Sequence, residues 1–149
     1  MGRYAQPIWT MSRSLPIVMG FLILATVCSL HAQEQARDFR IVFDEIQHGF
    51  ETGNISSFSS RFAQQLRIDL KGEGNRYCSA NQAFYILENF LKTRKVLSFE
   101  FTNVGANDDV PFASGVVVFS QKGAKETSHI YVSLMPFGKG WVIAEITLY

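Results

Sequence analysis

The spacing of apolar side chains along the first half of the chain predicts two helices. Between Ala36 and Glu51, five apolar side chains recur at intervals of three and four residues, which places them on one face of an amphipathic helix: Phe39, Val42, Phe43, Ile46 and Phe50. Gly53 should end this helix. We expect Asn54 to cap a short second helix, whose apolar side chains are Ile55, Phe58 and Phe62.

The spacing of apolar side chains then changes to the period of two that is typical of a strand, and it returns to a helical spacing after that strand. Leu66 to Lys71 alternates strictly between apolar and polar side chains, which predicts a strand with one buried and one exposed face. Ser79 and Gln82 have the spacing of a capping box, in which each side chain bonds the backbone N–H of the other residue. A helix should therefore start at Ser79 and run to about Lys92 or Arg94, with its apolar side on Ala83, Phe84, Leu87, Phe90 and Leu91.

The chain after Lys95 has the pattern of strands. Four are predicted, over Val96–Val104, Phe112–Gln121, Thr127–Met135 and Gly140–Leu148. The segments between them are short and contain Gly, Asn and Asp, so we expect hairpin turns between antiparallel neighbours. The predicted fold class is α+β, with helices packed on one face of a curved antiparallel sheet and the element order α-α-β-α-β-β-β-β.

This order resembles that of the nuclear transport factor 2-like, or cystatin-like, cone fold. Several segments also resemble a family of small exported bacterial proteins, domain of unknown function 4783. They are Gly53-Asn54 followed by Phe58 and Phe62, the strand Leu66 to Lys71, the run Tyr77 to Ala83 leading into Leu87 and Phe90, Ser98 to Phe101, and Trp141 to Ile143. The resemblance implies a cone fold and an exported location, and it brings no activity and no catalytic residues.

An apolar run near the N-terminus predicts an export signal. Arg3 and Arg13 precede 16 uncharged residues, Leu15 to Leu30, and the small residue Ala32 follows. This pattern predicts a signal peptide over residues 1–32, cleaved after Ala32, and a periplasmic or secreted protein. The run falls short of the roughly 20 residues that a transmembrane helix needs, so no stable membrane insertion is expected after cleavage. The alternative is a protein anchored in the membrane by an uncleaved leader.

Two other interpretations of the leader are weaker. A lipoprotein signal would place a lipid on Cys28, but Val27 before it is bulkier than the small residue that is normal there. A cytosolic protein with a buried N-terminal helix conflicts with the abrupt change to polar residues after Ala32.

Removal of the leader changes the charge and the cysteine count. Two of the 14 Lys and Arg leave with residues 1–32 and all 13 Asp and Glu stay, so residues 33–149 carry 12 minus 13, or a net charge of −1. No nucleic-acid partner is expected, because such partners need concentrated positive charge. The 117 remaining residues suit a single domain. Cys78 is their one cysteine, so no internal disulfide can form and a packed core must supply the stability.

The predicted inner face of the sheet has no acid–base chemistry. Alternation assigns to it only apolar side chains, namely Leu66, Ile68, Leu70, Leu97, Phe99, Phe101, Ile130, Val132, Leu134, Val142, Ala144, Ile146 and Leu148. A cone-fold isomerase or dehydratase needs a base and proton donors that converge inside the cavity. We therefore predict no catalytic residue, no cofactor and no metal site. A one-residue bulge would reverse the phase of a strand, and the run from Phe112 to Phe119, with Gly115 and apolar residues in both phases, is a place for one.

The outer face of the sheet is the preferred binding surface. It is predicted to present His129, Tyr131, Met135, Trp141, Ile143 and Tyr149, a mixture of aromatic and polar side chains that is typical of interface centres. An ordinary solvated sheet face is the competing interpretation. A homodimer through this face is the preferred partner hypothesis, and an unknown protein or small ligand is the other.

A second candidate lies near the third predicted helix. Tyr77, Cys78 and Tyr85 are expected to reach the mouth of the cone, although Cys78 is more simply a packing residue than a nucleophile paired with His48 or His129.

Two classes of function follow. The first is a non-enzymatic exported module that binds through the outer face or the cone mouth. The second is a small cavity enzyme of the isomerase or dehydratase type that works by proton transfer, for which only Tyr77, Tyr85, His48 and Asp69 are available. The second requires at least two ionisable side chains in one enclosed pocket.

Overall fold

The computed structural model describes residues 39–71 and 74–149 of the chain. The predicted leader over residues 1–32, with Cys28 and the cleavage site after Ala32, lies outside the described residues. The first helix is present over residues 39–52, and Gly53, with a φ of 68°, follows it. All five side chains of its predicted apolar face are buried. Within the described residues, no helix has the length and apolar character needed to cross a bilayer.

The predicted second helix is replaced by two single turns of 3₁₀-helix, η1 (Ile55–Ser57) and η2 (Ser59–Arg61). Asn54 makes no side-chain cap, and the Ser57 hydroxyl donates instead to the Asn54 carbonyl at 2.8 Å. Serine hydroxyls that bond the local backbone in this way compete with regular helix formation. Phe62 is already extended and begins the first strand.

The structure contains one strand more than the predicted order. β1 (Phe62–Leu70) pairs antiparallel with β2 (Gly74–Ser79), which was expected to be loop. β2 lies at the edge of the sheet and only Cys78 in it is buried. Because its other side chains are exposed, the segment has no apolar alternation that could have predicted a strand.

The predicted capping box is confirmed at the start of α2 (Ala80–Lys92). The Ser79 hydroxyl accepts from the Gln82 backbone N–H at 3.3 Å, and the Gln82 Oε1 accepts from the Ser79 N–H at 3.0 Å. The helix buries Ala83, Leu87 and Phe90. It thereby covers β1 and β2.

The last four strands are β3 (Lys95–Asn107), β4 (Val110–Gln121), β5 (Ala124–Phe137) and β6 (Gly140–Leu148). They form antiparallel hairpins, as predicted. β1 lies parallel to β6, so the six-stranded sheet is mixed and has the order β2-β1-β6-β5-β4-β3. The expected sheet was antiparallel throughout and differs at this pairing. A parallel pair needs a long connection, which the whole of the chain between β1 and β6 supplies.

A bulge in β6 changes which side its residues face. Ser133 of β5 lies opposite Glu145, but the next residue, Leu134, lies opposite Ile143. Ala144 is therefore an extra residue, and the inward position predicted for it is not observed: it is only half-buried.

Because of the bulge, the residues in the first half of this strand face the opposite side from the one predicted. Trp141 and Ile143 are 8% and 0% exposed and belong to the core, so their assignment to the outer face is wrong. Val142, predicted to point inward, takes the outer face instead and lies opposite Met135. The predicted phase holds beyond the bulge, where Ile146 and Leu148 are buried.

Two further register shifts lie in β3, and none lies in β4, the strand whose apolar residues in both phases left room for a bulge. Leu97 and Thr102 are the extra residues, so Leu97 is 45% exposed and is not an inward residue. β4 alternates regularly, and Gly115 lets β3 approach it closely. A Cβ at this position would clash with the Glu100 carbonyl oxygen and lie 2.7 Å from the Phe101 Cα.

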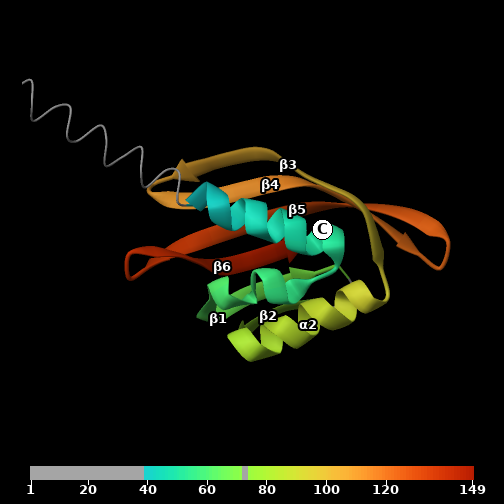
Figure 1. Ribbon diagram of the computed structural model, residues 1–149, viewed down its shortest axis with the longest axis horizontal. Helices are drawn as coiled ribbons and strands as arrows, with labels where there is room; N and C mark the ends of the chain where they lie inside the picture. The colour runs from blue at the N-terminus through green and yellow to red at the C-terminus, as the bar shows by residue number, and fades with distance from the viewer. Residues whose placement is uncertain (1–38, 72–73) are drawn as a thin grey trace, which may run out of the picture. The chain divides into compact units, whose positions relative to one another are not determined.

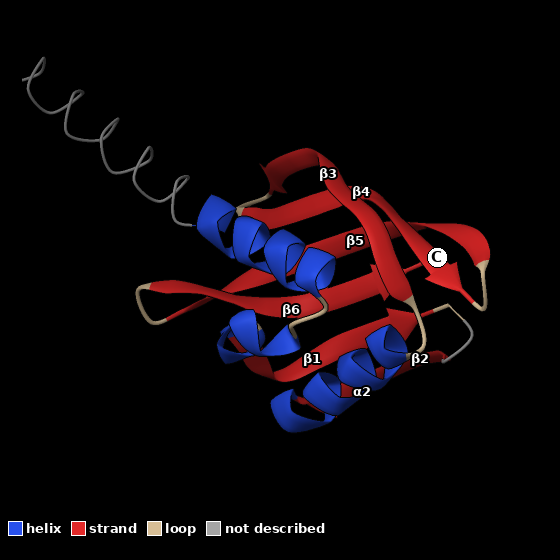
Figure 2. Ribbon diagram, turned by 45° about the vertical axis from the view of Figure 1, so that its right-hand side comes forward, coloured by secondary structure: helices blue, strands red, loops and turns tan. Residues whose placement is uncertain are grey.

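The helices that the structure describes all lie on one face of the sheet (Figure 1 and Figure 2). The first helix, drawn in cyan, and α2, in yellow-green, lie on the same side of the strands (Figure 1). Figure 2 shows the sheet curving behind them, with β3 bent across its end. Phenylalanines fill the space between the layers: Phe50 stacks on Phe58 and meets Phe99, and Phe43 meets Phe101 edge to face. The fold is α+β, as expected.

Candidate functional site

The outer face of the sheet carries two aromatic pairs. Phe112 of β4 stacks on Tyr131 of β5 with 6.2 Å between ring centroids, and His129 stacks on the terminal Tyr149 at 5.6 Å. Backbone hydrogen bonds of 2.8 and 3.0 Å between His129 and Tyr149 hold the second pair in register. His129 and Tyr149 are exposed, and Phe112 and Tyr131 are half-buried. Sequence analysis placed three of these four residues on this face and missed Phe112.

A polar network lies beside the aromatic pairs, on β1, β2 and β6. The Arg67 guanidinium is 3.1 Å from a Glu145 carboxylate oxygen and donates to the Asn75 side chain at 3.0 Å. Thr147 donates to the same Glu145 oxygen at 3.0 Å. Because these groups bond each other, they already have partners before any ligand arrives.

The other three predicted outer-face residues do not all lie on that face. Met135 lies on the outer face and is 44% exposed, whereas Trp141 packs edge to face against Phe39 of the first helix, with 6.3 Å between ring centroids. Ile143 is fully buried.

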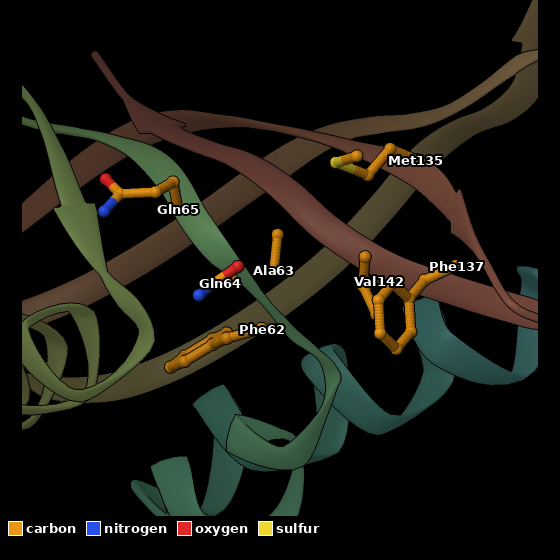
Figure 3. Close-up of a pocket in the computed structure, with 7 residues that line it drawn as sticks. All are labelled: Phe62, Ala63, Gln64, Gln65, Met135, Phe137 and Val142. Carbon is orange, nitrogen blue, oxygen red and sulfur yellow. The ribbon is translucent and has the colours of Figure 1, made fainter.

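A groove of about 550 Å³ lies at the end of the outer face where β1 leaves β6. The pairing of these strands shifts between Phe62 and Arg67, and the gap is lined by Phe62, Ala63, Gln64, Gln65, Met135, Phe137 and Val142. Figure 3 shows the two glutamine amides on the β1 side and Met135, Phe137 and Val142 on the β5–β6 side. No pattern in the sequence predicted this groove, since it arises from the register shift and from the start of β1, where Phe62 was expected to be helical.

The three predicted cone-mouth residues do come together. Tyr77, Cys78 and Tyr85 line a second hollow of about 340 Å³ between β2 and α2, with Arg76, Gln82 and Ile86. Tyr77 and Tyr85 are 78% and 54% exposed, but Cys78 is buried and its Sγ lies 3.7 Å from the Leu66 carbonyl oxygen. Burial raises the pKa of Cys78, and the charge of Arg76 opposes that rise. The thiol therefore stays protonated at neutral pH and is a weak nucleophile.

Of the proposed enzyme participants, Tyr77 and Tyr85 share the second hollow, and the others lie in different parts of the structure. His48 is exposed on the first helix, Asp69 lies 3.9 Å from Arg67 on the outer face, and His129 stacks on Tyr149. Among the described residues, the buried polar side chains are those of Ser128 and Ser133. The described interior therefore contains no pair of side chains that could act as acid and base in a proton transfer. No group of three or more His, Cys, Asp or Glu in residues 39–71 and 74–149 could hold a metal ion.

Solved structures of low sequence identity share the fold. A DUF4783 family protein from Bacteroides uniformis is 15% identical with a TM-score of 0.63, covering 70% of this chain and 93% of that one. An NTF-2 like protein of unknown function from Shewanella oneidensis is 10% identical with a TM-score of 0.56, covering 75% and 96%. A ketosteroid isomerase-like protein from Erwinia carotovora atroseptica is 11% identical with a TM-score of 0.63, covering 77% and 95%. These structures show that the chain has an NTF2-like fold, as expected. At such low identity they show the fold alone.

Sequence comparison assigns the family. No curated protein matches the chain. The model of the domain of unknown function DUF4783, however, matches residues 43–148, which cover most of the first helix, both 3₁₀ turns, α2 and all six strands. The resemblance noted in the sequence is thus confirmed, and the chain belongs to the DUF4783 family.

Proposed function

We propose that the protein is an exported, non-enzymatic binding module that pairs with a second copy of itself through the outer face of its sheet. The aromatic patch formed by Phe112, His129, Tyr131 and Tyr149 carries this proposal. Aromatic side chains present large contact areas with little loss of side-chain entropy, and they are enriched at the centres of interfaces. Export rests on the pattern of the leader sequence.

The surroundings of the patch favour a face-to-face dimer. The polar network of Arg67, Glu145 and Asn75 lies beside the patch, in the position of a polar rim around an apolar centre. Its members are already hydrogen-bonded to one another. A second copy therefore buries the aromatic rings without stripping unpaired charges of water.

The edges of the sheet are less suited to pairing. β3 forms one edge and contains two bulges, at Leu97 and Thr102, and bulges interrupt the regular ladder that an added strand needs. β2 forms the other edge and is short, with α2 packed beside it. Association through the face is therefore preferred over strand addition.

The test is the oligomeric state of residues 33–149, measured by size-exclusion chromatography with light scattering. We expect a dimer, and we expect Tyr131→Ala to raise its dissociation constant at least about fivefold, because truncating an aromatic side chain that anchors an interface costs more than about 1 kcal/mol. Tyr85→Ala is the matched control, since Tyr85 is an exposed tyrosine on α2, away from the patch. A wild-type monomer over the whole accessible concentration range would contradict the proposal.

A further inference from the structure

The groove at the β1–β6 gap has the size and lining of a small-molecule site. Its volume of about 550 Å³ falls within the range of roughly 300 to 1,000 Å³ that is usual for ligand pockets. Among the described residues, those that line it belong to strands, and one of them, Phe62, also packs edge to face against Phe58 of the core, with 5.7 Å between ring centroids. It also lies beyond the aromatic patch, toward the β5–β6 turn.

The groove is built by the backbone. β1 and β6 shift register between Phe62 and Arg67, and the bulge at Ala144 turns Val142 toward the outer face beside Met135. These two irregularities open the gap and at the same time give it an apolar wall. Without the bulge, the alternation of β6 would point Val142 into the core.

The lining selects against charge. Within residues 39–71 and 74–149, all seven lining side chains are uncharged, and five of them are apolar: Phe62, Ala63, Met135, Phe137 and Val142. A buried ion would find no counter-charge among these side chains, and leaving it unpaired is costly. The Gln64 and Gln65 amides each offer a donor and an acceptor, which suit a hydroxyl or carbonyl group.

We propose that this groove binds a neutral, mainly apolar small molecule that carries a hydroxyl or carbonyl group. The apolar part of the molecule lies against Met135, Phe137 and Val142, and the polar group bonds the glutamine amides. The exposure of Phe137, at 72%, leaves its ring available to cover such a ligand.

The experiment uses the full chain and the neutral fluorescent dye Nile red as probe. Binding is followed by titration, and 1-decanol and decanoate then compete for the dye, because they share a chain length and differ in charge. We expect decanol to displace the dye at a concentration at least about tenfold lower than decanoate does. Equal competition, or no dye binding, would overturn the proposal.

Substitutions of groove residues test whether the dye binds in the groove. Met135→Lys should weaken dye binding at least about tenfold, since the ammonium group would enter an uncharged groove. Leu97→Lys is the matched control and should bind as the wild type, because Leu97 is 45% exposed and Met135 is 44% exposed, and both are strand residues. Phe137→Lys provides a second change, at a more exposed position, should the first variant fold poorly. Unchanged binding in folded samples of both groove variants would place the dye elsewhere and refute the site.

Light scattering on the same samples separates this inference from the dimer. The proposal requires that Met135→Lys weaken dye binding while the oligomeric state stays that of the wild type. If the variant instead turns a dimer into a monomer, and dye binding falls only with the loss of the dimer, the second copy covers the groove and the ligand proposal is wrong.

Discussion

Burial sets the chemistry of Cys78 and links it to the stability of the fold. Its pKa is raised above the ordinary value of 9.0 by loss of solvent, with Arg76 opposing the rise. The unfolded chain, in which the thiol is solvated, therefore loses this proton at a lower pH than the folded chain does. Stability is full below pH 9.0 and falls as the pH rises from there toward the folded-state pKa.

We expect urea denaturation to show this loss between neutral pH and about pH 10. Cys78→Ala removes the thiol, so its free energy of unfolding should fall less over the same range, although it starts lower because a buried side chain has been shortened. The measurement is the difference between the two pH dependences, which cancels the other titrating groups. Parallel curves for the two proteins would contradict the assignment.

At the scale of the element, the close approach of β3 to β4 depends on Gly115. A Cβ there would meet the β3 backbone at Glu100 and Phe101, and backbone cannot yield as a flexible side chain can. We expect Gly115→Ala to lower the free energy of unfolding by about 1 to 3 kcal/mol, measured by urea denaturation. Gly105→Ala is the control on the same hairpin, because its Cβ would meet only the Phe112 ring, at 3.7 Å. Equal losses of unfolding free energy for the two substitutions would show that the close approach of β3 to β4 does not require a glycine at position 115.

The same elements show how far sequence patterns predict this fold. The first helix, α2 and the four C-terminal strands have clear periods or a capping box, and the structure contains them all. Patterns fail where side chains do not alternate, as in the exposed edge strand β2, and where both phases are apolar, as in residues 141–144. There a bulge determines which side of the sheet each residue faces, and it places Trp141 against Phe39 of the first helix.

The same limits decide how much of the candidate site could be predicted from the sequence. Polar side chains mark the outer face at His129 and Tyr131, so the sequence could place them. The groove depends on Val142 and on the first residues of β1, whose position is fixed by a parallel pairing between distant segments. No local period contains that information.

At the scale of the whole molecule, stability rests on the aromatic layer between helices and sheet. Phe50 is fully buried and joins three parts of the fold, since it lies on the first helix, stacks on Phe58 at 5.8 Å and meets Phe99 of β3 at 5.3 Å. The ion pair of Lys71 and Glu126, 3.0 Å apart, is by contrast largely exposed to solvent. Exposed pairs contribute little, because water and salt screen them.

Phe50→Ala should therefore lower the free energy of unfolding by about 3 to 5 kcal/mol, through lost burial and the cavity it leaves. Lys71→Ala should change it by less than about 1 kcal/mol. Urea denaturation at low and high salt checks both, with Trp141 fluorescence as the signal, because that ring packs against the first helix. Should the lysine change cost as much as the phenylalanine change, or should salt abolish the difference, surface charge and not the aromatic layer would dominate the stability of the fold.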